Sequence, residues 1–294
     1  HDVNEKLGDN FAIPALVSTS GSGAEGHTNL HANQSRINFS TSTPLEGDTL
    51  VTMFEWDMLG GAGGSNKPEP RLRHAYGSWK GVLAGQTWTN FVSDGAVGQM
   101  RKINFLPEPG TNAARQAQLR YSRNGFSVAL EDPQNLGGEV LVNGAYQSKA
   151  TLPDLTARYQ SQAGDFQYAV AGVLRLLEHD NGAADDSATG WGLNLEGKYD
   201  VSKTVTLRGT IKYGDGIGGY IATSPAEKIA GYVDPATGSL ETIEQLGFAA
   251  SVAVKAGPGH INLGYGMAKA DMDDAVKSGA ITAAAANEKF EAIH

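Results

Sequence analysis

The sequence alternates between apolar and polar residues in many short segments. The clearest segment, residues 204–213, reads TVTLRGTIKY, with Leu207 and Ile211 on one face and Arg208 and Lys212 on the other. A period of two is the signature of a β-strand with one apolar face, and it does not fit a helix. The same alternation recurs at residues 36–40, 50–58, 117–121, 126–130, 155–159 and 191–196. We therefore predict an all-β, antiparallel fold.

The segments between these strands sort into two alternating kinds. Short turns are predicted at residues 44–47, 80–81, 123–125, 161–164, 200–203 and 257–259. Long polar loops are predicted at residues 60–69, 90–114, 132–152, 179–189, 214–242 and 271–287. Short turns at one end and long loops at the other are typical of outer-membrane β-barrels. The pattern thus predicts a transmembrane antiparallel β-barrel.

Length and composition are compatible with this prediction. The chain has 294 residues, a formal net charge of −9 and no cysteine. The acidic balance argues against nucleic-acid binding, and the lack of cysteine excludes disulfides and thiolate metal sites. No apolar run approaches the ~18 residues of a membrane-spanning helix, whereas a barrel strand needs only about 10 alternating residues.

The strand count predicts one barrel domain over residues 1–294 that is incomplete at both ends. About twelve strands are expected, with the start of a thirteenth near residues 288–293, and residues 1–26 are expected to form an extracellular loop. A closed, even-numbered barrel would need one more strand before His1 and several after His294. We therefore expect the chain to be a piece of a longer barrel.

Aromatic residues mark one end of the predicted strands. Tyr121, Tyr159 and Tyr199 each fall on the apolar face just before a short turn. Outer-membrane barrels carry aromatic girdles where the lipid meets water. The three tyrosines are predicted to form part of such a girdle.

Alternation also predicts which charged residues face the lumen. The predicted inward bases are Arg36, Arg71, Arg73, Arg120, Arg158, Arg175, Lys198, Arg208, Lys212 and Lys255. The predicted inward acids are Glu55, Asp57, Glu131, Asp154 and Glu196. Rings of Arg and Lys in a narrow aqueous passage favour anions, and the guanidinium fork pairs well with carboxylates. The alternative is that some of these bases only pair with Glu55 and Asp57. The same parity places His74 on the lipid face or at a subunit interface.

One loop is a candidate for the constriction of the pore. Residues 90–114 form the third long loop if a strand precedes His1, and they contain Arg101 and Lys102. Folded into the lumen, the loop would present both cations at the narrowest point. The alternative is an ordinary surface loop with solvated charges.

Motifs for catalysis, cofactors or metals carry little weight in this chain. The glycine pattern at 214–219 formally fits a dinucleotide-binding turn, but its strand alternates and Pro225 follows in place of a helix. His27 and His31 lack the glutamate of a zinc-protease motif. We expect no catalytic residues, no metal and no cofactor.

Several segments resemble the DcaP-like porins of Gram-negative outer membranes. They are residues 30–39 (LHANQSRINF), 71–77 (RLRHAYG), 83–89 (LAGQTWT), 118–121 (QLRY) and 129–133 (ALEDP). The resemblance implies a trimer of sixteen-stranded barrels, a third loop that narrows each pore, and uptake of dicarboxylates and similar acids. Arg36, Arg71 and Arg73 lie inside the matching segments, whereas Arg101 and Lys102 lie in a variable loop.

The combined expectation is an outer-membrane porin for passive diffusion of small organic anions such as dicarboxylates. Its expected surroundings are the lipid bilayer and lipopolysaccharide of a Gram-negative outer membrane, and a homotrimer is the expected assembly. Two alternatives stay open. A plugged structural or adhesive barrel would carry balanced lumen charge, and an outer-membrane lipid hydrolase would need a Ser–His pair at the lipid-facing rim.

Overall fold

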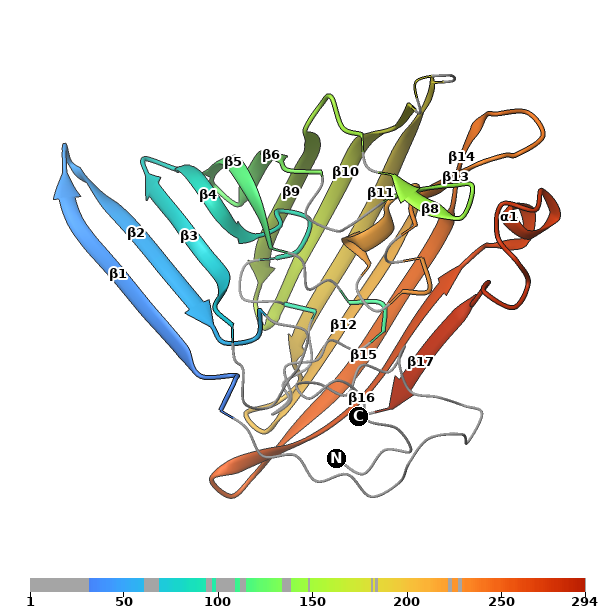
Figure 1. Cartoon of the computed structure of the whole chain (residues 1–294). Helices are drawn as coiled ribbons and strands as arrows, with labels where there is room; N and C mark the ends of the chain where they lie inside the picture. The colour runs from blue at the N-terminus through green and yellow to red at the C-terminus, as the bar shows by residue number, and fades with distance from the viewer. Residues whose placement is uncertain are drawn as a thin grey trace.

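Thirteen antiparallel strands form one continuous curved sheet (Figure 1). The computed structural model describes residues 32–60, 69–93, 97–98, 109–111, 115–133, 139–147, 149–180, 182, 185–221, 224–226 and 229–293. In sheet order the strands are β1 (Arg36–Leu45), β2 (Asp48–Asp57), β3 (Arg71–Trp79), β4 (Val82–Trp88), β5 (Arg115–Arg123), β6 (Phe126–Glu131), β9 (Asp154–Ala163), β10 (Phe166–Asp180), β11 (Asp185–Asp200), β12 (Val205–Asp215), β15 (Glu244–Ala256), β16 (Gly259–Ala270) and β17 (Lys289–Ile293). The predicted twelve strands and the start of a thirteenth are confirmed. β1 and β17 are the two edges of the sheet, so the described strands form an arc of a barrel.

Tight turns join the strands at one end of the sheet. In the turns at Glu46–Gly47, Lys80–Gly81 and Asn124–Gly125, both central residues have positive φ angles. This is the geometry of a type I′ turn, whose twist matches that of the strands it joins. Glycine at the second position adopts this conformation without the steric cost that a Cβ would bring.

The two faces of the sheet have opposite character. Outward-facing apolar side chains such as Leu119, Leu193 and Ile211 are exposed, whereas inward-facing polar side chains such as Asn194 and Thr210 are buried. A soluble protein would bury the apolar face, but a barrel in lipid turns it outward and keeps the polar face inside. The predicted transmembrane barrel architecture is confirmed.

The hairpin of β10 and β11 is longer than a membrane crossing requires. Its pairing continues without a break from Phe166↔Tyr199 to Asp180↔Asp185, although about 10 residues suffice to cross the membrane. The predicted long loop at residues 179–189 is therefore wrong, because strand pairing continues through most of it. The extra length forms a wall that projects at the end of the barrel opposite the tight turns.

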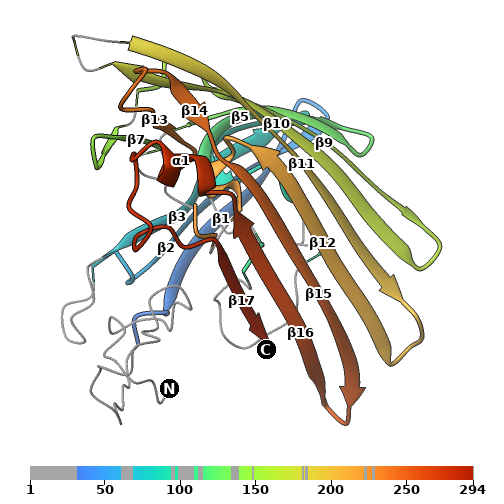
Figure 2. The same cartoon turned by 90° about the vertical axis from the view of Figure 1, so that its right-hand side faces the viewer.

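A second sheet, which was not predicted, packs against this wall. It has the order β14 (Leu240–Thr242), β13 (Gly231–Val233), β7 (Val140–Val142) and β8 (Ala145–Gln147), built from the two connections at 132–153 and 216–243. One apolar cluster joins it to Leu177 of β10. Another joins it to the loop that carries helix α1 (Asp273–Lys277). Figures 1 and 2 show the small sheet and α1 together at the end opposite the β15–β16 turn.

A β-bulge in β3 corrects one face assignment. The register runs Glu55↔His74 and then Trp56↔Leu72, so Arg73 is an extra residue on its strand. The bulge shifts the parity of every following residue. His74 is buried and lies 3.0 Å from the hydroxyl of Thr87. The placement of His74 on the lipid face or a subunit interface is therefore wrong.

Candidate functional site: the inner wall and its inward loops

An ion-pair network covers the inner face where β2 meets β3. Arg71 donates to both oxygens of Asp57, at 3.0 Å from Nε and 2.6 Å from Nη2. Arg73 donates to Glu55 at 2.7 Å and to Asp57 at 3.1 Å. The Arg73 side chain is only 2% exposed, whereas that of Arg71 is 31% exposed. The predicted pairing of these bases with Glu55 and Asp57 is thus present, and Arg71 still offers its charge to the interior.

Two further guanidinium groups interact electrostatically with this network. Arg36 of β1 lies opposite Asp57 in the strand register and interacts electrostatically with Arg71 and Arg73. Arg115 lies 4.7 Å from the ring centroid of Trp88 and also interacts with both arginines. Arg115 is missing from the sequence-based list because, as the first residue of β5, it has the same outward parity as Ala117 and Leu119.

The loop after β4 turns inward at Asn90. The backbone N–H of Asn90 donates to Glu131 at 2.7 Å, and its side-chain oxygen accepts a hydrogen bond from Ser127 at 2.6 Å. The hydroxyl of Thr156 donates to the same Glu131 oxygen at 2.8 Å. Asn90 is fully buried. These contacts fix the start of the loop to the inner face of β6 and β9.

The next residues of the loop lie against β9 and β11. Arg158 donates to the carbonyl of Val92 at 2.6 Å. Asn194 donates to the carbonyl of Phe91 at 2.7 Å, and the N–H of Ser93 donates to Glu196 at 3.1 Å. Inward wall residues thus bind the loop backbone, because an irregular chain inside a barrel must find partners for its peptide groups.

Further along, glycines allow the loop to lie directly on the wall. A methyl group added to Gly98 would lie 2.7 Å from the carbonyl oxygen of Gly209, and one added to Gly247 would lie 2.7 Å from that of Gly110. Lys212 is buried here and donates to the Gly110 carbonyl at 3.4 Å. The described parts of residues 90–114 therefore lie inside the barrel, from β6 across to β15. The surface-loop alternative is wrong for these parts.

Arg175 is the centre of a second inward anchor. Its guanidinium donates to both oxygens of Glu139 at 2.7 Å and forms an ion pair with Asp154 at 3.1 Å. It also donates to the carbonyl of Ile217 at 3.1 Å, while the Tyr220 hydroxyl donates to Asp154 at 2.9 Å. The Arg175 side chain is 0% exposed. Arg175 therefore joins two inward connections to the wall and has no surface toward a pore.

Two buried titratable groups of this anchor, Glu139 and Tyr220, lie outside the membrane-spanning strands. Desolvation raises the pKa of Glu139 above its usual value, although the charge of Arg175 opposes the shift. Desolvation likewise raises the pKa of Tyr220.

The glycine pattern at 214–219 has a structural role beside this anchor. Positive φ angles at Gly216 and Gly218 let the chain turn back from β12 and bring Tyr220 to Arg175.

The remaining predicted site residues divide into two groups. Arg208 lies on the inner face of β12 and is partly exposed. Arg101 and Lys102, like the predicted extracellular loop at residues 1–26, lie outside the described residues. Within the described ranges, no cluster of three or more His, Asp or Glu side chains is arranged to hold a metal ion. No helix in the same ranges is long and apolar enough to cross a membrane.

An outward apolar band, an inward polar face and loops folded into the interior define an outer-membrane β-barrel of the porin type. The profile of the DcaP outer membrane protein family matches residues 6–227. The chain belongs to this family, and its location is the outer membrane of a Gram-negative bacterium.

Solved structures show the same fold. The outer membrane channel DcaP of Acinetobacter baumannii superposes with a TM-score of 0.81 at 23% identity, over 100% of this chain and 81% of that one. Salmonella typhi OmpF, in a complex with daunomycin, matches with a TM-score of 0.51 at 12% identity, over 81% of this chain and 72% of that one. No match was found among curated protein sequences.

Proposed function

We propose that the protein is a porin for passive diffusion of small organic anions, such as dicarboxylates, through a basic lumen. The observation that carries this proposal is the charge of the inner face. The inward parity of the strands carries the ten predicted bases, against the five predicted acids together with Asp186, which accepts a hydrogen bond from the N–H of Leu240 at 2.8 Å, and Asp200, which binds Lys198 at 2.8 Å. The excess of positive charge lies inside a barrel whose whole chain is acidic.

The proposed mechanism requires no covalent chemistry. Positive wall charge raises the local concentration of anions and lowers that of cations. Arg71 and Arg208 keep partly exposed side chains on the inner face. A carboxylate can exchange between such groups, and several weak sites permit release as well as entry. A dicarboxylate gains more than a monovalent anion because it can meet two cations at once.

The inward loop supports a constriction in the same passage. Its described residues lie inside the barrel and are held by Arg158, Asn194 and Lys212. We propose that residues 90–114 narrow the pore, with Arg101 and Lys102 as its cationic rim. The buried Arg175 then acts as a positioning residue, because it holds neighbouring loops in place without facing the pore.

The test is ion selectivity of the full-length protein in a planar lipid bilayer. Under a salt gradient, the reversal potential should have the sign of anion preference, and succinate or phthalate should reduce chloride current at millimolar concentrations. A reversal potential of the opposite sign would refute the basic-lumen mechanism.

One observation favours a second function. The inward loop and the second sheet both fill space inside or at the end of the barrel. A plugged barrel with a structural or adhesive role would also be built this way. It predicts no conductance in the same bilayer experiment, whereas the porin predicts stable open channels.

We also propose a homotrimer, from the family to which the chain belongs. Chemical cross-linking of the full-length protein in native outer membranes should yield a band at three times the monomer mass. A band at the monomer mass alone would contradict this assembly.

A further inference from the structure

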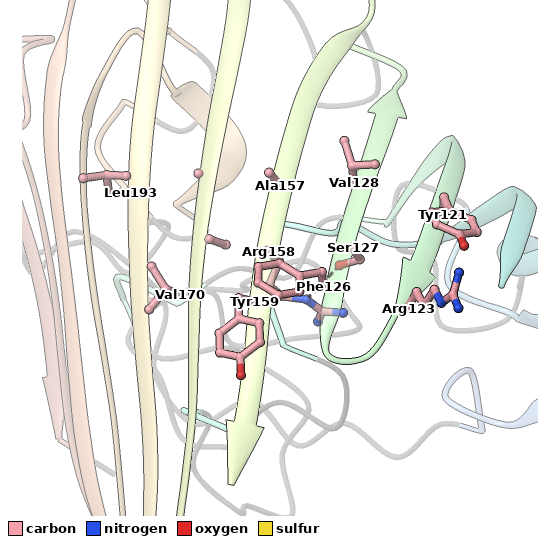
Figure 3. Close-up of a pocket in the computed structure, with 12 residues that line it drawn as sticks. Tyr121, Arg123, Phe126, Ser127, Val128, Ala157, Arg158, Tyr159, Val170 and Leu193 are labelled. Carbon is pink, nitrogen blue, oxygen red and sulfur yellow. Dashed lines mark hydrogen bonds between the residues drawn. The ribbon is translucent and has the colours of Figure 1, made fainter.

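The lipid-facing side of the sheet contains a hollow of about 450 Å³. It lies over β5, β6, β9, β10 and β11, near the tight-turn end, and its lining is almost wholly apolar (Figure 3). Most of the outward face of a barrel strand is covered evenly by large apolar side chains. A local hollow therefore needs an explanation in the sequence.

The strand register explains why the surface is hollow there. One row of paired outward residues reads Tyr121, Val128, Ala157, Gly172 and Leu193 across the strands. Ala157 and Gly172 are small and form the floor, whereas Val128 and Leu193 stand on either side of it.

The neighbouring rows close the hollow along the strands. The row toward the tight turns carries Phe126, Tyr159 and Val170, and the rings of Phe126 and Tyr159 lie 4.4 Å apart between centroids. The row on the other side carries Leu155 and Leu174. Large apolar side chains therefore line the hollow on its tight-turn side, and the row of Leu155 and Leu174 lies beyond its other side.

A cation marks one end of the hollow. Arg123 lies on the same outward face as Tyr121, two residues closer to the Asn124–Gly125 turn, and it also lines the hollow (Figure 3). Two strand residues span about 7 Å. Tyr121 is one of the tyrosines predicted to form the aromatic girdle at the lipid–water boundary, which places Arg123 at the expected depth of lipid headgroups.

We propose that this hollow is a binding site for one anionic glycerophospholipid of the periplasmic leaflet. One acyl chain lies over Ala157 and Gly172, and the phosphate accepts hydrogen bonds from the guanidinium of Arg123. Charge complementarity selects an anionic lipid, because Arg123 is exposed at headgroup level while the rest of the hollow offers only apolar surface. The tight turns place the site at the periplasmic end, since outer-membrane barrels have their short turns there.

The experiment is native mass spectrometry of the full-length protein in detergent, with phosphatidylglycerol added as the probe. Wild-type protein should retain one phosphatidylglycerol per subunit. Ala157→Leu fills the floor and should abolish this retention. Ala250→Leu adds the same volume to the outward face of β15, away from the hollow, and should retain the lipid. Both variants should show the heat-dependent gel mobility of a folded barrel.

A second pair of variants tests the headgroup contact. Arg123→Gln should bind phosphatidylglycerol about fivefold more weakly, which corresponds to about 1 kcal/mol for one basic side chain at a membrane surface. Lys203→Gln removes a cation from the β11–β12 turn and should leave binding unchanged. Equal retention by wild type and Ala157→Leu would refute the site. A changed oligomeric state in Ala157→Leu would instead identify the hollow as an interface with a second copy. Unchanged affinity in Arg123→Gln would refute the phosphate contact.

Discussion

Removal of the Arg71 charge should reduce the anion-to-cation permeability ratio of the channel. Arg71 is partly exposed on the inner face, so an ion in the lumen can approach its guanidinium to roughly 6 Å. In water a unit charge at that distance contributes about 0.7 kcal/mol, and screening at 0.1 M salt roughly halves this energy. Each ion then changes about twofold in local concentration, in opposite directions for anions and cations. Arg71→Gln should therefore lower the anion-to-cation permeability ratio about three- to fourfold.

The fold should survive this substitution. Asp57 keeps its hydrogen bonds from Arg73 at 3.1 Å and from the N–H of Leu59 at 3.2 Å. Arg123→Gln is the matched control, because the same charge is removed from the outward face and the reversal potential should not move. Glu55→Gln removes an acid from the network and should shift selectivity the other way.

The assay is the reversal potential of single channels under a tenfold salt gradient, measured near 0.1 M and again near 1 M. The effect of Arg71→Gln should nearly vanish at 1 M, where the screening length falls to about 3 Å. If Arg71→Gln and Glu55→Gln shift the potential in the same direction, or if neither shifts it at 0.1 M, the basic wall does not set selectivity.

Three further predictions concern the inward anchors. Arg175→Leu should lower the free energy of unfolding by about 3–5 kcal/mol, measured by denaturant titration, because it leaves buried carboxylates unpaired; a change below 1 kcal/mol would contradict the anchor. Gly247→Ala should lower single-channel conductance, because its new methyl group would lie 2.7 Å from the Gly110 carbonyl and push the loop away from the wall into the pore, whereas Gly77→Ala has open space and should conduct like wild type. Since the pKa of Glu139 is raised in the folded protein, the stability that Glu139 contributes is present below pH 4.5 and is lost as the pH rises through its pKa in the folded state. The unfolding temperature should therefore fall over this pH range, and Glu139→Gln should make the fall shallower. An unchanged slope in Glu139→Gln would assign the fall to other groups.

The sequence was a good guide to the strands and their faces. Alternation at residues 204–213 correctly separates outward Leu207 and Ile211 from inward Arg208 and Lys212. It was a poor guide to connections, because residues 132–152 lack a sustained alternation and yet supply β7 and β8. Three-residue strands are too short to show a period, and only the parallel pairing of β7 with β13 makes them a sheet.

Face assignment also failed where regularity was locally lost. One extra residue in β3 moved His74 to the inner face, and nothing in the letters RLRHAYG indicates the bulge. Arg71 and Arg73 were both predicted to face inward, with pairing to Glu55 and Asp57 as the alternative, and both arginines make that pairing. Alternation could not tell that one of them is buried and the other partly exposed, because exposure depends on neighbouring strands.

By itself the sequence determined the strand period, the two faces and the placement of tight turns, because these depend on residues that are close together along the chain. The tertiary structure decided which inward bases remain exposed to the lumen. Lys212 is covered by Gly110, 102 residues away, and Ser93 meets Glu196 at a separation of 103. Arg175 is enclosed by Glu139 and Ile217 from two different connections. Contacts of such long range arise only when the sheet curves and its loops fold into the space that it encloses.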